Sequence, residues 1–438
     1  MKLAAALLAL AALPVSAQTP NLTGRWLVTL NFYNATQYMH LDLTQEINKL
    51  TGTFGGDKLE GTLTPAASGK DATFHFFAKD EKGSTEDVTG TLTNGTLTAT
   101  VHEVHPDDTP LNYAITAIRI PSRPTAAPQR HEFTPTVFHH TYSPANPPVL
   151  TINPGDTVHT WTVDAGGNDG DNIKRTYGGN PQTGPFYIQS AMPGDTLVVH
   201  ILRLRLNRDS AGSDDGMVES SLNSGLAVKM KDTGKSIAWK LDRTAGIATP
   251  LHPSEHLAHY TIPLRPMLGC VATAVSPTAT PPPTGDSGGY GGNMDFNEIT
   301  EGTTLYLPVQ NPGALLYLGD AHAAQGDGEL NGNALETSMD VEFSVDVIPN
   351  KSPHGRRVET PTHIIAMGYN GSLDDAFKDA TANMATWLTE DYSLTASEIA
   401  QVLGTSAEYK VSEVADRNSG IVLKLNKDRL KPLKTKAP

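Results

Sequence analysis

Short runs in which apolar and polar residues alternate constrain the fold of this chain more than any other feature of its sequence. Between residues 21 and 104 they include 26–32 and 72–77, and Thr and Gly recur between them. A period of two, interrupted by turn residues about every 8–12 positions, is typical of antiparallel strands. Asn94-Gly95, between two Thr-rich runs, predicts a tight hairpin. We therefore expect a small antiparallel β-barrel or sandwich in this region.

Composition narrows the class of protein further. The 438 residues carry 33 Lys and Arg against 47 Asp and Glu, a net charge of −14 that argues against nucleic-acid binding. Charged residues make up only 18% of the chain, and 39 Gly with 31 Pro indicate a turn-rich, β-heavy globule. The single cysteine, Cys270, excludes an internal disulfide and a Cys-based zinc knuckle. Beyond the N-terminus, no apolar run reaches the roughly 18 residues of a membrane span.

The first 17 residues have the pattern of an export signal. Lys2 precedes the apolar stretch 3–13, and Val15-Ser16-Ala17 fits the small-x-small cleavage pattern. A membrane anchor is the alternative, but the apolar stretch is too short for one. We expect cleavage after Ala17 and a periplasmic or secreted mature protein, with a net charge of −15 because Lys2 is lost.

The remaining chain divides at a Pro-rich linker, residues 121–130, which separates an accessory β-domain (18–120) from a larger domain (131–438). In the larger domain, Pro-Gly-Asp at 154–156 and again at 193–195 leads into a strand-like run, which hints at an internal duplication. The fold class expected is mainly β with C-terminal helices.

Those helices are predicted by their caps and spacing. One follows Ser372, with apolar residues at helical intervals from Leu373 to Leu388. The second opens with the capping box 395–398 and ends near Gly404. A last strand is expected near residues 420–425.

Three polar clusters are candidates for chemistry. The densest, GDAHAAQGDGE at 319–329, holds Asp320, His322, Asp327 and Glu329. Asp-x-His places a carboxylate and an imidazole on one side of an extended segment, which suits a divalent metal of the zinc type, although a solvated acidic loop would have the same composition. The second cluster, GGYGGNMDFNE at 288–298, contains Asn293 and Asp295, and the third joins 139–140 to Asp164.

These clusters resemble the acetamidase/formamidase family of amide hydrolases. The resemblance covers about 130–428, and its most specific feature is GGNMD followed, 24 residues after Asp295, by GD-x-H-x-x-QGDGE. Further matching features are His140, Pro154-Gly155-Asp156, Asp164, Thr183-Gly184-Pro185, Arg265-Pro266, Glu336 and the C-terminal segment RRVETPTHIIAMG. Residues 21–120 have no counterpart in the core family, and Val271-Ala272-Thr273-Ala274 departs from its usual Gly-Val-Ala-Pro.

The resemblance implies an enzyme that cleaves the C–N bond of small amides such as formamide and acetamide, releases ammonia and uses a divalent metal of the zinc type. It also implies a homo-oligomer. The implied metal ligands are Asp295, Asp320 and His322, completed by His140 or Asp164. Glu329 or Glu336 would act as the catalytic base, and Gly292, Asn293 and Gln325 would bind substrate.

Other interpretations stay open at this point. Cys270 could be a nucleophile, although an apolar run without a basic neighbour is typical of an inert buried cysteine. A Ser-Ser-Lys amidase would draw on Ser220-Ser221 or Ser224-Gly225. A third possibility is an exported binding protein on a degenerate amidase fold, with a ligand in the N-terminal barrel. The aromatic residues there are expected to fill the barrel core: Trp26, Phe32, Tyr33, Phe74, Phe76 and Phe77.

Overall fold

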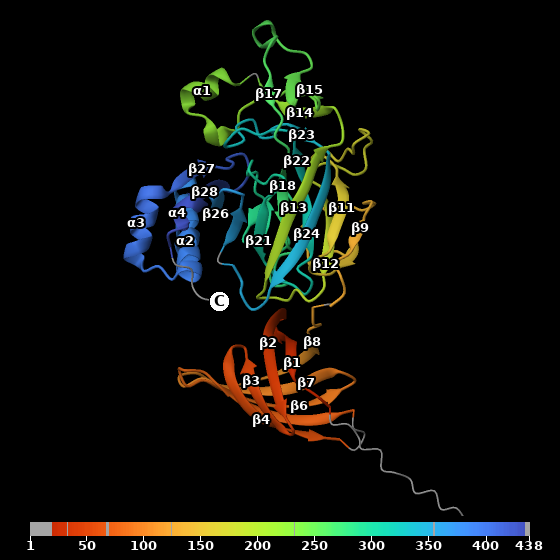
Figure 1. Ribbon diagram of the computed structural model, residues 1–438, viewed down its shortest axis with the longest axis vertical. Helices are drawn as coiled ribbons and strands as arrows, with labels where there is room; N and C mark the ends of the chain where they lie inside the picture. Colours follow the sequence, from red (N-terminus) through yellow and green to blue (C-terminus); the bar gives the residue numbers. More distant parts are fainter. Residues whose placement is uncertain are drawn as a thin grey trace, which may run out of the picture. The chain divides into compact units, whose positions relative to one another are not determined.

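The computed structural model describes residues 20–433, apart from residues 33, 67–69, 124, 232 and 354. The expected export signal, residues 1–17, lies outside the described residues. The chain forms two compact units, and the boundary between them in the sequence lies between Ile120 and Pro121 (Figure 1).

The first unit is a closed barrel of eight antiparallel strands, each paired with its neighbour in sequence and the last with the first. The strands are β1 Gly24–Phe32, β2 Ala35–Glu46, β3 Lys49–Phe54, β4 Asp57–Pro65, β5 Ala72–Lys79, β6 Thr85–Thr93, β7 Thr96–Val104 and β8 Leu111–Arg119. Asn94 and Gly95 both have positive φ angles, 50° and 81°, and form the two-residue turn expected between β6 and β7.

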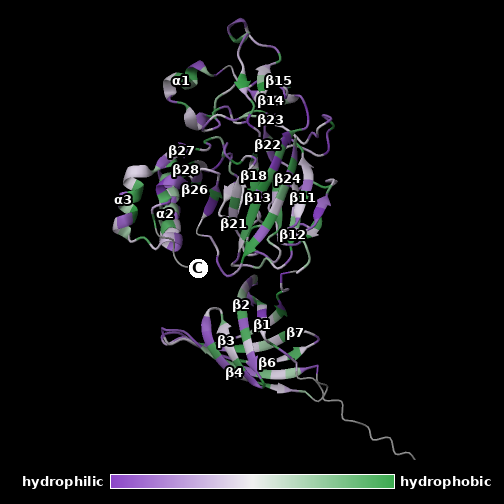
Figure 2. Cartoon of the chain, viewed as in Figure 1, coloured by the Kyte–Doolittle hydropathy of each residue, from purple (hydrophilic) through white to green (hydrophobic). Residues whose placement is uncertain are grey.

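The interior of the barrel is filled with apolar side chains. Trp26, Phe74 and Phe76 lie in this core with leucines and valines from the other strands. Phe77 was wrongly expected there: its side chain is 45% exposed, because consecutive residues of a strand face opposite sides of the sheet. Figure 2 shows the resulting alternation of hydropathy along the barrel strands. Tyr33 lies outside the described residues.

The second unit contains two large sheets and the helices. The strands of the first sheet are β10 Leu150–Ile152, β12 Gln182–Ile188, β14 Ser210–Asp214, β15 Ser236–Asp242, β16 Ile247–Pro250, β17 Ile262–Pro263, β18 Met267–Ala272, β19 Ser287–Gly288, β20 Gly291–Asn293, β22 Leu316–His322 and β23 Glu336–Thr337. Those of the second are β9 Arg130–Glu132, β11 Thr157–Thr162, β13 Thr196–Leu206, β21 Thr304–Pro308, β24 Met339–Ile348, β25 Arg356–Glu359, β26 His363–Asn370, β27 Glu408–Val411 and β28 Ser419–Asn426. An extensive apolar core joins residues of both sheets.

The two Pro-Gly-Asp turns start equivalent strands. Asp156 accepts a hydrogen bond from the Asn153 backbone, and Asp195 accepts one from the Met192 backbone, so each carboxylate closes its turn in the same way. The strands that follow, β11 and β13, lie on opposite sides of β24 and are both antiparallel to it. This symmetric placement agrees with the duplication suggested by the sequence.

The C-terminal helices are α2 Leu373–Tyr392, α3 Ala396–Ser406 and α4 Lys427–Leu430; the shorter helices are α1 Ser224–Lys229, η1 Glu219–Ser221 and η2 Glu255–Leu257. Ser372 caps α2, and the capping box of Thr395 and Glu398 opens α3, as the sequence predicts. Met384, Trp387 and Leu388 pack on β26 and β28, whereas Phe377 is largely exposed. The expected fold class, mainly β with C-terminal helices, is confirmed. Within the described residues, no helix has the length and apolarity needed to cross a membrane.

Candidate functional site

Strand pairing in the first sheet of the second unit brings the matched motifs together. In β22, Gly319 lies opposite Cys270 of β18, and Cys270 lies opposite Asn293 of β20 on its other side. At the end of β22, His322 lies opposite Glu336 of β23. Residues far apart in sequence therefore meet at one place on the sheet.

Three buried acceptor atoms face one another at this place. They are Asp295 Oδ1, Asp320 Oδ1 and His322 Nε2, none of which has a hydrogen-bond partner. The histidine nitrogen lies 3.9 Å from the Asp295 oxygen, 3.7 Å from the Asp320 oxygen and 3.2 Å from Glu336 Oε1. A buried acceptor without a donor is costly, so these atoms favour a bound proton or a cation.

Gln325 fixes the orientation of the His322 ring. Its side-chain oxygen lies 2.9 Å from His322 Nδ1, while its amide nitrogen donates to the backbone carbonyls of Asp295 and Ser412. Because the Gln325 nitrogen is engaged by two acceptors, its oxygen must accept the Nδ1 proton. This leaves Nε2 directed at the carboxylates, as in metal-binding histidines.

The backbone around the cluster is unusual. Asp295, Asp320 and Glu329 all have positive φ angles, 37°, 54° and 47°, a conformation that costs non-glycine residues of order 1–3 kcal/mol each. Gly269 allows two of these carboxylates to approach: a Cβ there would lie 2.4 Å from Asp295 Oδ1 and 2.6 Å from Asp320 Oδ2. Strained backbone conformations and closely approaching carboxylates at one place are typical of a functional site.

Burial and mutual repulsion between the carboxylates govern the pKa values in the cluster. Burial, together with Glu329 and Asp320, raises the pKa of Asp295 well above its ordinary value. Burial likewise raises the pKa of Glu329, and it raises that of Glu336 to about 7 with help from Asp320. Burial alone would lower the pKa of His322, but the charges of Glu336 and Asp320 raise it. A site that gathers protons in this way is one where a metal would displace them.

Two overlapping groups of residues could hold a metal ion. One comprises Asp295, His322 and Glu329, the other Asp320, His322 and Glu336, and within each group the ligand atoms lie within 4.8 Å of one another. Carboxylate and imidazole donors fit a divalent ion of the zinc type. The orphaned acceptor atoms agree with that donor set, so the residues present fit the metal that the sequence suggests.

Two proposed ligands lie outside both groups. His140 stacks on the ring of Tyr177 at 3.7 Å, and its Nε2 lies 3.1 Å from the Tyr177 carbonyl oxygen. Asp164 forms a buried ion pair with Arg208 at 2.7 Å and accepts hydrogen bonds from Asn168. The structure therefore places Asp295 and Asp320 beside His322, in two different groups, and neither group includes His140 or Asp164.

A cavity of about 310 Å³ opens beside the cluster. It is lined by Asn293, together with the four carboxylates of the two groups and Asp416. Gly292 supports this wall through its backbone: φ is 96°, and a Cβ would lie 2.3 Å from the Asp286 carbonyl. Gln325 acts on His322, as described above, and is absent from the cavity lining. Of the three residues expected to bind substrate, only Asn293 therefore faces the cavity.

The alternative nucleophiles are poorly placed. Cys270 is fully buried, and burial and the charges of Asp320 and Asp295 raise the pKa of its thiol, which disfavours the reactive thiolate. Its sulfur donates to Asn293 Oδ1 at 2.8 Å. The hydroxyls of Ser220 and Ser221 donate to backbone carbonyls, of Val414 and Val218 respectively.

Sequence reasoning missed the C-terminal contribution to the site. Asp416, in the connection between β27 and β28, lines the cavity and accepts a 2.5 Å hydrogen bond from Asn293 Nδ2. Burial raises its pKa to about 6. The Asp416 backbone N–H donates to Glu413 Oε2 at 3.2 Å, and burial and Asp416 raise the Glu413 pKa to about 8. The segment SEVADRN at 412–418 carries no motif, so only its position in the fold identifies it.

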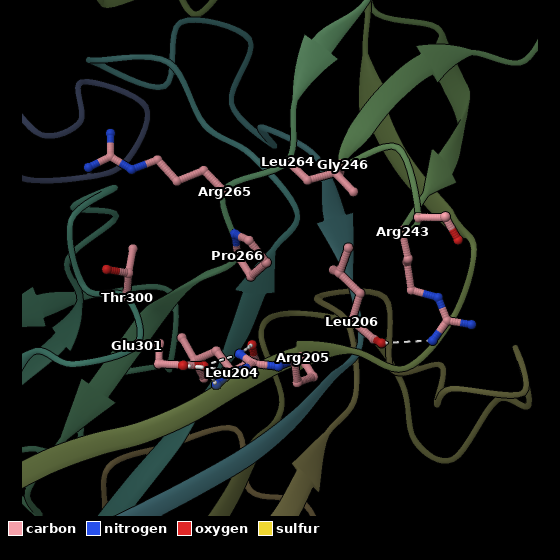
Figure 3. A pocket seen from close by; sticks show the side chains of 11 residues that line it. Leu204, Arg205, Leu206, Arg243, Gly246, Leu264, Arg265, Pro266, Thr300 and Glu301 are labelled. Carbon is pink, nitrogen blue, oxygen red and sulfur yellow. Dashed lines mark hydrogen bonds and ion pairs between the residues drawn. The ribbon is translucent and has the colours of Figure 1, made fainter.

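A larger and more open pocket lies elsewhere in the second unit and is lined by three arginines (Figure 3). Arg205 pairs with Glu301, and Arg243 pairs with Asp209 and donates to the Leu206 carbonyl. Arg265, part of the matched Arg265-Pro266 motif, lines this pocket and is absent from the lining of the acidic cavity. The size of a pocket is thus a poor guide to the chemistry of this protein.

Comparison with known proteins shows which proteins share this β-rich fold and its buried carboxylate–imidazole cluster. The Acetamidase/Formamidase family model matches residues 278–407, which include both metal-binding groups. A formamidase from Methylophilus methylotrophus is 24% identical over 349 residues, 64% of this chain and 86% of that protein.

Two solved structures are similar over nearly their whole length. An acetamidase from Bacillus halodurans has 28% identity and a TM-score of 0.59, with 69% of this chain and 99% of that chain aligned. A predicted acetamidase/formamidase from Thermoanaerobacter tengcongensis has 25% identity and a TM-score of 0.61, with 70% and 99% aligned. The chain is thus similar to acetamidases and formamidases over 64–70% of its length, and it carries an N-terminal eight-stranded barrel.

Proposed function

We propose that this protein hydrolyses the C–N bond of small linear amides, such as formamide and acetamide, and releases ammonia and a carboxylate. The observation that carries the proposal is the set of three orphaned acceptors, Asp295 Oδ1, Asp320 Oδ1 and His322 Nε2, beside a small polar cavity. Formamidases and acetamidases are the relatives in which the matching segments occur.

Hydrolysis forms one C–O bond from water and breaks the C–N bond, and the departing nitrogen must receive a proton. Asp295, Asp320 and His322 would hold a divalent ion, which we propose to be zinc. When bound, such an ion supplies a Lewis acid and lowers the pKa of water toward 7. The remaining requirements of the reaction fall to the protein's own side chains.

Glu336 is placed to move the proton. It lines the cavity, its Oε1 lies 3.2 Å from His322 Nε2, and its Oε2 accepts a hydrogen bond from the Ala165 backbone at 3.4 Å. Ala165 thereby holds the carboxylate in one orientation. In this proposal Glu336 takes a proton from water at Oε1 and returns it to the leaving nitrogen. Glu329, on the other side of His322, is the alternative carrier.

A degenerate amidase fold that only binds a ligand is less well supported. The matched acidic residues are all present, and four of them, Asp295, Asp320, Glu329 and Glu336, surround His322. The barrel interior, where a ligand was considered, is occupied by its own side chains. Both observations favour an enzyme.

We further propose that residues 1–17 direct export and are removed, so that the enzyme acts in the periplasm or outside the cell. This rests on the sequence pattern of the segment. A homo-oligomer is proposed from the family resemblance alone. Mass spectrometry of the N-terminus of the exported protein and sedimentation analysis test these two points.

The test of function is an ammonia-release assay with formamide and acetamide, before and after treatment with a chelator, combined with metal analysis. We expect ammonia release that the chelator abolishes and that zinc restores. Asp320→Ala and His322→Ala should lose both the metal and the activity. Asp327→Ala is the matched control, because this acid of the same segment pairs with Lys410 outside the cluster. If Asp320→Ala keeps full activity and full metal content, the proposal is wrong.

A further inference from the structure

The cavity beside the cluster is polar on almost every side. Five carboxylates line it: Asp295, Asp320, Glu329, Glu336 and Asp416. The other lining residues are asparagines, glycines and Pro283, so no aliphatic side chain of the described residues faces the substrate. A pocket that selected amides by an alkyl chain would be lined by apolar side chains.

The side-chain nitrogens of the lining asparagines are already engaged by carboxylates. Asn180 Nδ2 donates to Asp320 at 3.2 Å, Asn293 Nδ2 to Asp416 at 2.5 Å and Asn333 Nδ2 to Asp214 at 2.5 Å. What the wall offers to a ligand is therefore mainly acceptors. Two of them, Asp295 Oδ1 and Asp320 Oδ1, are buried and lack any donor.

The charged side chains of the lining also favour a ligand that donates hydrogen bonds. No lysine or arginine within the described part of the chain lines the cavity. Arg208, which lies nearby, is already paired with Asp164. Asp416, which belongs to neither metal-binding group, lies on the wall contributed by the β27–β28 connection.

We propose that the acyl part of the substrate carries a hydrogen-bond donor, and preferably a positive charge, which Asp416 accepts. The preferred substrates are then amides of the glycinamide type rather than simple aliphatic amides, and amides with a carboxylate are rejected. This inference rests on the proposed amidase function and specifies the substrate class of the same site.

Four amides of nearly equal size test it, since they differ only in the group attached to CH₂–CO–NH₂: glycinamide (ammonium), glycolamide (hydroxyl), propionamide (methyl) and malonamate (carboxylate). At pH 7 most of the glycinamide is cationic, since an α-amino group has a pKa near 8. We expect kcat/KM for ammonia release from glycinamide to exceed that from propionamide more than 10-fold, glycolamide to lie between them, and malonamate to be the poorest. Metal content is measured after each incubation, so that chelation by the amine is not mistaken for selectivity.

Asp416→Asn assigns the effect to one residue. The asparagine oxygen can still accept the bond from Asn293 Nδ2, but the negative charge is gone. The ratio of kcat/KM for glycinamide over propionamide should fall at least 10-fold. Asp107→Asn removes one charge from an exposed position of the barrel and should leave the ratio unchanged.

The outcomes separate the two proposals. If the protein releases ammonia from propionamide as well as from glycinamide, or if the ratio does not reach 10, the inference about substrate is overturned while the amidase function stands. An unchanged ratio in Asp416→Asn overturns the role of Asp416. If no amide gives ammonia with metal-loaded protein, the proposed function fails, and this inference fails with it.

Discussion

The barrel and the second unit are both built mainly from antiparallel strands, yet their interiors differ in kind. In the barrel, the fully buried side chains are Trp, Phe, Leu, Val, Ile and Ala. Every fully buried polar or charged side chain of the described residues lies in the second unit, between Asp156 and Glu413. An apolar interior is stabilised by burial alone, whereas buried carboxylates cost stability and persist where a ligand requires them. The difference indicates which unit carries the chemistry.

The largest effect is expected from a change to the barrel core. Phe76→Ala removes a fully buried ring that contacts Phe54 and Phe74, and should destabilise the barrel by about 3–5 kcal/mol. Urea unfolding of the full-length protein, read on barrel peptides by a hydrogen-exchange pulse at one fixed pH, measures it. Phe77→Ala is the matched control on the outer face and should cost less than about 1 kcal/mol. If Phe76→Ala and Phe77→Ala lower the free energy of unfolding equally, packing of the barrel core does not stabilise the barrel.

Gly269→Ala tests the buried carboxylate cluster of the second unit. The new Cβ would overlap the oxygens of Asp295 and Asp320, so the carboxylates must separate. We expect zinc affinity to fall about 100-fold, measured by competition with a chromogenic chelator. Gly212→Ala is the control, because a Cβ at that position meets no atom within 4 Å. Unchanged zinc binding in Gly269→Ala would show that the two oxygens are not ligands.

Gln325→Ala tests the positioning of His322. Loss of the 2.9 Å contact to Nδ1 frees the imidazole to rotate, and zinc affinity should fall about 10-fold. Gln325→Glu keeps an oxygen acceptor for Nδ1 and should recover part of the loss. If Gln325→Ala binds zinc as tightly as the unchanged protein, packing alone orients the ring.

The smallest effect concerns Glu86, a partly buried carboxylate in the barrel. Burial, with Asp57, Glu103 and Asp80 nearby, raises the pKa of Glu86 to about 7, although its neighbour His105 opposes the shift. The folded barrel therefore holds a proton that the unfolded chain loses above pH 4.5, and stability falls between about pH 4.5 and 7. Glu86→Gln should remove this slope, worth about 1 kcal/mol after allowance for solvent screening.

Urea titrations at pH 5 and pH 8, with the same exchange pulse, measure the slope. Glu60→Gln, on the exposed outer face of the barrel, should retain it. A slope of the opposite sign in the unchanged protein would show that Glu86 is stabilised as the carboxylate.

Much of this site was accessible from the sequence because its motifs are short and local. Asp320 and His322 lie two residues apart on β22, and Asp295 follows the glycines of β20. The expectations for His140 and Asp164 came from the family pattern. The structure instead places His140 against Tyr177 and Asp164 against Arg208, partners that are distant in sequence. Asp416 could not be found in advance, since its segment, 412–418, belongs to none of the matched motifs.

The sequence by itself determined the periods of the strands, the hairpin at Asn94-Gly95, the capped helices and the acidic motifs, because each depends on neighbours within a few residues. Only the tertiary structure decided which carboxylates share one cavity and which are neutralised by an arginine. That decision depends on strand register: Cys270 opposite Asn293 and His322 opposite Glu336 are set by the packing of the whole sheet. Local sequence patterns do not predict which residues of distant strands will pair.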